Sequence, residues 1–329
     1  MSGGGGGGVD PRLDPEMRAF NARMEERAAR QPPITLTFPF DGPRALTEAL
    51  NLPLSEGGPA MEESADRWLP IRGRRLLCRF HRPAGAAPGP LPVLVYLHGG
   101  GWVWNSIDTH DRLMREYAAA AGCAILGPDY ALSPEAVFPQ AVEECAAVLR
   151  WVAAQGAEWG LDTGRIVLGG DSAGGNLAMG AALLLRDAEG GALPPGLRGL
   201  LLNYGVFDSR LDTPSYREFA TGYGLTRERM AFYWSVYAPR EADRAHPYAA
   251  PLRARDLSGL PPSLLHVAEL DVLASESLAM AARLREAGVA VTETVFPGTV
   301  HGFLRAVGHV GAARRAVAEA GEWLRAHFA

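Results

Sequence analysis

Lysine is absent from this chain of 329 residues, so all 32 basic side chains are arginines. A chain without lysine cannot contain a Walker P-loop, a Schiff-base lysine or a Ser-Lys catalytic dyad. Neither sign of charge is in large excess, because the formal net charge is only −5. The composition therefore gives no reason to expect binding to nucleic acid or to an anionic membrane surface.

Cysteine is also scarce, and long hydrophobic runs are missing. Cys78, Cys123 and Cys145 are widely spaced in apolar contexts, so we expect buried thiols in a reducing cytosol rather than metal ligands or a redox pair. No apolar run reaches the ~20 residues needed to cross a bilayer, and the N-terminus lacks the pattern of a secretory signal. We therefore expect a cytoplasmic protein with no membrane span. We expect disorder in the glycine run at 3–8, which has nothing to bury.

The hydrophobic content of 47% is sufficient for a large core, and its pattern indicates an α/β fold. Strand-like runs on both sides of Gly73 predict an antiparallel hairpin over 67–82. Further short apolar runs alternate with helical stretches, at 92–97, 124–126, 166–168, 200–203, 264–267 and 291–296. This alternation predicts a mostly parallel, doubly wound sheet of about eight strands, with the functional site at the carboxyl ends of the strands.

Two segments do not fit this alternation, 1–50 and 207–250. The first contains a predicted amphipathic helix near 17–29. The second is rich in aromatic residues: Phe207, Tyr216, Phe219, Tyr223, Phe232, Tyr233, Trp234 and Tyr237. A single aromatic residue on a helix usually packs in a core, but the cluster as a whole favours a cap over an apolar substrate pocket. We therefore divide the chain into a cap made of 1–50 and 207–250 and a core made of 51–206 and 251–329.

The stretch Gly170-Asp171-Ser172-Ala173-Gly174 lies where a strand must turn into a helix. Small residues two positions before and two after Ser172 relieve the crowding in such a turn. This is the G-x-S-x-G pattern of a nucleophile elbow, which holds a serine hydroxyl above the sheet. A phosphate-binding turn or a simple helix cap would also place a serine there.

A serine nucleophile needs a base, and the base needs an orienting acid. Asp271 and His301 each follow a predicted strand, in the chain order Ser, Asp, His of α/β hydrolases. Taken alone, Asp271 could be a helix N-cap and His301 a hydrogen-bonded loop residue. No His-x-x-x-His pair or carboxylate partner suggests a metal, so we expect neither a metal nor a cofactor.

The stretch His98-Gly-Gly-Gly-Trp102 follows the predicted strand at 92–97. Glycines let the backbone turn its amides inward, so the N–H groups of Gly100 and Gly101 can join that of Ala173 in an oxyanion hole. A glycine run on its own could instead be a flexible loop.

The stretches that carry a family resemblance lie between Arg67 and Phe303. They are "HGGGW", "DYALSPEAVFPQAVEE", "GDSAGGN", "GYGLTRERMAFYW", "HPYAAPL", "LSGLPPSLLHVAELD" and "HGF". In these stretches the chain resembles the hormone-sensitive-lipase-like family of α/β hydrolases, which includes many bacterial carboxylesterases. The resemblance implies the α/β-hydrolase fold with a helical cap. It also implies the site: Ser172 as nucleophile, His301 as base, Asp271 as acid, and Gly100, Gly101 and Ala173 as oxyanion hole.

The chain departs from the commoner family pattern near the predicted acid and in the "DYALSPE" stretch. Val272 and Ser275 stand where many members have a proline and a second aspartate, which puts a supporting second acid in doubt. Ala131 and Ser133 replace the arginine and alanine of "DYRLAPE". We further expect four aromatic residues to contact the substrate: Trp102, Tyr204, Phe207 and Tyr223.

The leading hypothesis is a cofactor-independent serine carboxylesterase for small or medium acyl esters. An arylformamidase-type amidase would use the same residues. A non-catalytic ligand receptor is a third hypothesis, but the plant gibberellin receptors, which resemble this family, have lost the histidine that is present here as His301. The apolar strand at 291–296 also predicts a homodimer, because an exposed strand edge can pair with a second copy.

Overall fold

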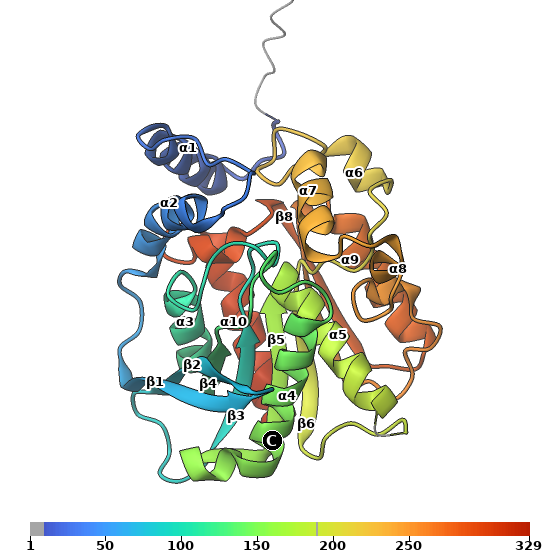
Figure 1. Ribbon diagram of the computed structural model, residues 1–329. Coiled ribbons are helices and arrows are strands. Elements are labelled where there is room, and N and C mark those ends of the chain that lie inside the picture. Colours follow the sequence, from blue (N-terminus) through green and yellow to red (C-terminus); the bar gives the residue numbers. More distant parts are fainter. Residues whose placement is uncertain (1–9, 189) are drawn as a thin grey trace, which may run out of the picture.

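The computed structural model describes residues 10–188 and 190–329, which form one eight-stranded sheet with helices on both faces (Figure 1). The strand order is β1-β2-β4-β3-β5-β6-β7-β8. The strands are β1 (Met61–Ile71), β2 (Arg74–Pro83), β3 (Leu91–Leu97), β4 (Ala124–Pro128), β5 (Leu161–Asp171), β6 (Leu197–Asn203), β7 (Ser263–Leu270) and β8 (Val291–Val300). The glycine run at 3–8 lies outside the described residues.

The sheet is parallel from β4 through β8, whereas β1 and β2 form an antiparallel hairpin that pairs with β4 at one edge. The predicted mostly parallel sheet of about eight strands is therefore confirmed. Each expected strand is present, although several are longer than their apolar runs. The strand β5 begins at Leu161, before the buried run at 166–168, because Leu161 already pairs with Leu91 on β3.

The helices of the core cover the two faces of the sheet. Figure 1 shows α10 behind the sheet and α4 and α5 in front of it, and α3 packs against α10. The helices of the core are α3 (Asp111–Ala121), α4 (Gln140–Gln155), α5 (Ala173–Ala188), α9 (Ala274–Glu286) and α10 (Gly311–Phe328). Because almost every residue of α5 from Ala173 to Leu185 is buried, this helix is fixed on all sides.

The remaining helices gather mainly at the upper end of the molecule in Figure 1. They are α1 (Pro15–Ala29), α2 (Asp41–Asn51), α6 (Pro214–Glu218), α7 (Arg227–Tyr237) and α8 (Glu241–Arg244). Two contacts join the segments that are distant in sequence. The Tyr223 hydroxyl donates to Asp10 (2.6 Å), and Arg12 pairs with Glu218 (2.8 Å). The N-terminal helices and the aromatic-rich segment thus lie together above the sheet.

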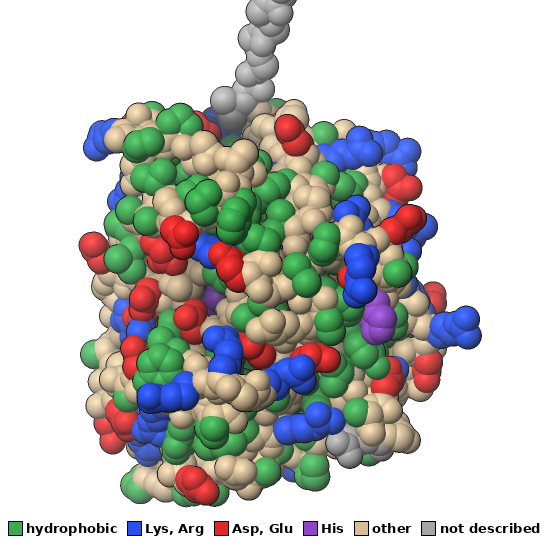
Figure 2. All heavy atoms as spheres, in the orientation of Figure 1, with side chains coloured by type: hydrophobic (Ala, Val, Ile, Leu, Met, Phe, Trp, Pro, Cys, Tyr) green, Lys and Arg blue, Asp and Glu red, His purple; other side chains and the backbone are tan. Residues whose placement is uncertain are grey.

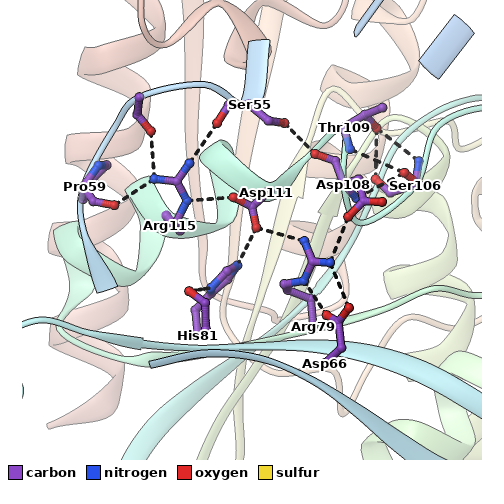
Figure 3. A network of polar contacts seen from close by, with 12 residues as sticks. Ser55, Pro59, Asp66, Arg79, His81, Ser106, Asp108, Thr109, Asp111 and Arg115 are labelled. Carbon is purple, nitrogen blue, oxygen red and sulfur yellow. Dashed lines mark hydrogen bonds and ion pairs between the residues drawn. The ribbon is translucent and has the colours of Figure 1, made fainter. Parts of the chain in front are cut away.

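The segment between α2 and β1 is held to the core by a polar network (Figure 3). The Arg115 guanidinium donates to the carbonyl oxygens of Ser55 and Pro59 and to the carboxylate of Asp111 (each 2.8 Å). Burial raises the pKa of Asp111, but His81 and Arg115 outweigh that effect and hold it well below the usual range. The linker to the N-terminal helices is thus fixed by charge-assisted hydrogen bonds.

The three cysteines are buried and free, as expected, and burial raises the pKa of Cys123 to about 12. Within the described part of the chain, no helix has the length and apolar character required to cross a bilayer. Figure 2 shows charged side chains of both signs interspersed over one face. Hydrophobic side chains gather on the upper half of this face, near α1 and α7.

Candidate active site

Ser172 lies in the turn between β5 and α5, with its backbone in the left-handed region (φ 56°). Such a conformation is strained for a residue other than glycine and is typical of functional turns. The turn also requires small neighbours, because a Cβ atom on Gly170 or Gly174 would collide with the carbonyl oxygen of Leu97. The structure therefore has the strand, sharp turn and helix that the G-x-S-x-G pattern needs.

Ser172, Asp271 and His301 each directly follow a parallel strand, namely β5, β7 and β8. The fold brings them together: Ser172 Oγ lies 2.8 Å from His301 Nε2, and His301 Nδ1 lies 2.7 Å from Asp271 Oδ2. With the imidazole proton on Nδ1, the ring donates to Asp271 and accepts from the Ser172 hydroxyl. This is the geometry of a hydroxyl, a base and an orienting acid.

The Asp271 side chain is 1% exposed and that of His301 is 13% exposed. The second carboxylate oxygen of Asp271 accepts the N–H of Leu273 (3.0 Å), while α9 begins only at Ala274 without a side-chain cap. The helix-cap alternative therefore does not describe Asp271. One oxygen fixes the local turn, and the other remains directed at the imidazole.

The glycines at positions 99 to 101 follow β3 in the chain and lie close to the turn that holds Ser172. Gly100 and Gly101 have positive φ angles (141° and 61°), which only glycine adopts readily. A Cβ atom on Gly101 would lie 2.6 Å from the ring of Tyr233. Within residues 10–188 and 190–329, neither N–H group donates a hydrogen bond. Ala173 is the first residue of α5, where an amide has no partner inside the helix.

Asp171 ties this glycine segment to the nucleophile turn, a role that the sequence reasoning missed. Its Oδ1 atom accepts from the N–H of Gly99 (3.1 Å) and from the Tyr96 hydroxyl (2.9 Å), and His110 Nε2 lies 3.4 Å away. Burial raises the pKa of Asp171, but the electrostatic effect of the nearby His110 and the hydrogen bond from Tyr96 outweigh this, so the pKa is lowered. The position of Asp171 immediately before Ser172 was the available signal.

A cavity of about 180 Å³ opens at Ser172 and His301. Its other lining residues are Gly99, Gly100, Gly101, Asp171 and Gly302 from the strand ends, and Asn51, Trp104, Asn105, Leu225, Arg229, Tyr233 and Arg305 around them. The cavity is small beside the ~300–1,000 Å³ usual for drug-sized ligands. The last seven residues were not singled out from the sequence, although Tyr233 belongs to the aromatic cluster.

None of the four aromatic residues expected to contact the substrate lines this cavity. Trp102 is fully buried and stacks on Tyr237, with ring centroids 4.2 Å apart. Tyr204 lies behind the triad, edge-on to His301 at 5.1 Å. Phe207 is fully buried, and the Tyr223 hydroxyl is bound to Asp10. The direction of each ring follows from tertiary packing, which residue spacing does not encode.

Among the described residues, no group of three or more His, Cys, Asp or Glu side chains is arranged to hold a metal ion. Asn51, Asn105 and Asp171 beside Ser172 are instead engaged in hydrogen bonds that fix loops. The chemistry available at the site is therefore that of the serine, the histidine, the aspartate and the backbone amides.

Comparison with known proteins identifies the family. A family model described as alpha/beta hydrolase fold matches residues 94–305. A carboxylic ester hydrolase, LipN, of Mycobacterium tuberculosis is 36% identical over 291 residues, which cover 87% of this chain and 74% of the relative. An ethyl acetate hydrolase of Pseudomonas putida is 36% identical over 234 residues, covering 71% of this chain and 73% of the relative.

Solved structures agree over almost the whole chain. A thermostable esterase from Pseudomonas putida is 33% identical and has a TM-score of 0.90, covering 98% of this chain and 99% of that chain. An ester hydrolase from the metagenome of Lake Arreo, solved with a bipyridine phosphonate derivative, is 33% identical with a TM-score of 0.89, covering 96% and 99%. The chain belongs to the α/β hydrolase family of carboxylic ester hydrolases that are similar to hormone-sensitive lipase.

Proposed function

We propose that this carboxylic ester hydrolase cleaves small acyl esters through an acyl-enzyme on Ser172, with His301 as base and Asp271 as its orienting acid. The observation that carries the proposal is the pair of short contacts, 2.8 Å from Ser172 Oγ to His301 Nε2 and 2.7 Å from His301 Nδ1 to Asp271. A weak nucleophile is activated by a base in direct contact with it.

In the first half of the reaction, Ser172 Oγ attacks the ester carbonyl carbon while its proton passes to His301 Nε2. The negative charge that develops on the carbonyl oxygen is held by the N–H groups of Gly100, Gly101 and Ala173. A preorganised donor of this kind contributes about 3–4 kcal/mol of transition-state stabilisation. When the intermediate collapses, the C–O bond to the alcohol breaks and His301 returns the proton to the leaving alcohol.

In the second half, water attacks the acyl-enzyme and gives its proton to His301. The second tetrahedral intermediate then releases the carboxylic acid, and the proton returns to Ser172 Oγ. Asp271 stays ionised throughout, because it fixes the imidazole tautomer and stabilises the imidazolium rather than taking the proton. The whole cycle requires no cofactor.

A short acyl group is favoured by the size of the cavity, about 180 Å³. Relatives named acetyl esterase in Salmonella are 38% identical over 219 residues, 66% of this chain and 67% of the relative. Their name and that of the ethyl acetate hydrolase support a two-carbon acyl group for this chain as well. The aromatic residues Trp102, Tyr204, Phe207 and Tyr223 enter this proposal only as packing partners.

The experiment that tests the proposal is hydrolysis of p-nitrophenyl esters from acetate to decanoate by wild type and Ser172→Ala side by side. We expect turnover to peak at acetate or propanoate and to vanish in the variant. Full activity in Ser172→Ala would contradict the mechanism. An aryl formamide measured at the same enzyme concentration tests the amidase alternative, which faster formamide turnover would support.

Two further predictions stay attached to the proposal. The strand β8 forms one edge of the sheet, and Val295 on it is 41% exposed, which supports a homodimer through this strand. Light scattering at micromolar concentration tests this, and a monomer would contradict it. A cytoplasmic location stays a prediction, supported by three buried thiols.

A further inference from the structure

Two arginine side chains line the cavity at Ser172, and they come from different parts of the chain. Arg229 belongs to α7, and Arg305 belongs to the short 3-10 helix η4 (Phe303–Ala306), which follows His301. In the part of the chain that the structure describes, neither guanidinium forms an ion pair with a carboxylate within 4.0 Å. Charged side chains in a small cavity are rarely left without a counter-ion.

Arg305 has N–H donors that no acceptor satisfies. Its Nη2 atom donates to Asn51 Oδ1 (2.5 Å), whereas its Nε atom is buried and has no hydrogen-bond partner. Burial lowers the pKa of Arg305, but a guanidinium keeps its proton in proteins, so the positive charge persists. A buried donor without a partner is costly, so an acceptor supplied by a ligand would be favoured beside this partly exposed guanidinium.

The other polar side chains of the cavity are already satisfied. Asn51 Nδ2 donates to Asn105 Oδ1 (3.0 Å), and Asn105 Nδ2 donates to the carbonyl oxygen of Gly99 (3.1 Å). Asp171 is the one acidic residue among those lining the cavity, and its Oδ1 accepts two hydrogen bonds. Two cations thus face one anion. Glu48 and Asp171 also act electrostatically on Arg305, but neither pairs with it directly.

We propose that this cavity selects esters that carry a carboxylate, which Arg305 and Arg229 bind while Ser172 attacks the ester carbonyl. The inference rests on the proposed function and names its substrate class. A carboxylate matches the planar donor fork of a guanidinium and forms strong charge-assisted hydrogen bonds with it. Two kinds of small ester provide this chemistry: half-esters of dicarboxylic acids, with the charge on the acyl half, and acylated hydroxy acids, with the charge on the alcohol half.

The structural alternative is that Arg305 only anchors the end of α2 through Asn51. That role would affect all esters equally, whereas charge recognition changes the ratio between a charged ester and its neutral counterpart. Two substrate pairs measure this ratio. Ethyl hydrogen succinate is compared with ethyl 4-oxopentanoate, and acetoxyacetate with acetoxyacetone, so that in each pair a methyl group replaces one carboxylate oxygen.

The experiment measures kcat/KM by acid release at neutral pH for wild type, Arg305→Gln, Arg305→Lys and Arg229→Gln. The control is Arg227→Gln, which removes the same charge from the same helix, at an exposed residue that does not line the cavity. We expect wild type to prefer the charged member of at least one pair by about tenfold, the size of one charge-assisted hydrogen bond. The pair that shows it tells which half of the ester carries the charge.

Each glutamine variant should lower that preference about tenfold, Arg305→Lys should retain part of it, and the control should leave it unchanged. Added salt should slow the charged ester and not the neutral one. Equal or faster cleavage of the neutral member in both pairs would overturn the inference while leaving the esterase mechanism intact. So would glutamine variants that slow both members equally. Absence of any Ser172-dependent turnover of the neutral esters would instead overturn the proposed function, and the inference with it.

Discussion

The residues around Ser172 and the residues that enclose the cavity beside it are positioned in different ways. Ser172, Asp271 and His301 follow the ends of β5, β7 and β8, three parallel strands of one sheet, so their relative positions are set by the hydrogen-bonded sheet. Asn51, Arg229 and Arg305 come from different helices and meet through side-chain contacts, such as the hydrogen bond between Asn51 and Arg305. If the proposed function is right, the difference teaches that the sheet edge fixes the reacting groups and that the helices above it determine substrate recognition.

The largest expected effect on activity concerns the residues at the strand ends, Ser172 and His301. Ser172→Ala and His301→Ala should each lower kcat by about ten-thousandfold or more, because the two residues act as a unit. For the same reason, the double variant should lose little more than either single variant. Steady-state assays with p-nitrophenyl acetate check this, with circular dichroism as the control for folding. Losses that multiply in the double variant would show that the two side chains work independently.

The next effect tests the backbone of the same region. In Gly101→Ala the new Cβ atom collides with the Tyr233 ring and displaces an oxyanion donor, so kcat should fall by about a hundredfold to a thousandfold. Gly122→Ala is the matched control, since Gly122 has a similar φ of 65° but open space around its Cβ position. It should lose about 1 kcal/mol of stability and keep its kcat. Equal losses of kcat in both variants would contradict the oxyanion role.

A smaller effect is expected from the helical side of the cavity. Leu225→Ala removes apolar volume from the lining, so kcat/KM for butanoate should rise a few-fold relative to acetate, a change within the range of one or two methylenes. The total rate with acetate should stay within about tenfold of wild type. Leu278→Ala, at an exposed leucine on α9, is the control. An unchanged chain-length profile would show that Leu225 does not bound the acyl site.

The smallest expected effect on activity concerns Glu276, at the contact between α9 and the start of the aromatic-rich segment. Glu276 on α9 is buried, and its Oε2 accepts the N–H groups of Phe207 and Asp208, where the aromatic-rich segment begins. Burial raises the pKa of Glu276 to about 8. Between its unfolded pKa near 4.3 and this value, the folded state keeps a proton that the unfolded chain has lost, so stability falls as the pH rises.

Glu276→Gln should remove this dependence, because an amide does not titrate. In chemical denaturation from pH 5 to pH 8, the free energy of unfolding of the variant should rise relative to that of wild type by up to ~1.4 kcal/mol per pH unit. Activity with p-nitrophenyl acetate should change little, since Glu276 does not line the cavity. A difference in stability that does not change with pH would mean that Glu276 is ionised in the folded protein.

The contrast between the strand-end residues and the cavity residues also explains which features could be predicted from the sequence. The expected strands, the hairpin around Gly73 and the buried cysteines are found in the structure, because apolar alternation and turn residues act locally. Ser172, Asp271 and His301 meet as their chain order and strand-end positions predicted. Such positions can be predicted from the sequence, since residues that follow parallel strands lie at the same edge of the sheet.

The cavity lining could not be predicted in this way. Asn51 and Arg305 lie 254 positions apart and meet through one hydrogen bond, which no spacing rule anticipates. Of the aromatic residues expected there, Trp102, Tyr204 and Phe207 are buried in the core. At Ser275, where many relatives have a second aspartate, the side chain accepts the N–H of Ser215 at the start of α6 (3.1 Å), and the Ser215 hydroxyl accepts the N–H of Ser275 (3.2 Å). The departure therefore joins α6 to the loop of Asp271.

The central claim is that Ser172 forms the covalent intermediate, and labelling with a p-nitrophenyl alkylphosphonate tests it most directly. A phosphonate mimics the tetrahedral intermediate and stays attached to the nucleophile. Intact-protein mass spectrometry of wild type should show one adduct, mapped to Ser172 by peptide analysis, and Ser172→Ala should show none. An adduct of equal yield in Ser172→Ala, or an unlabelled wild type that still hydrolyses esters, would contradict the account.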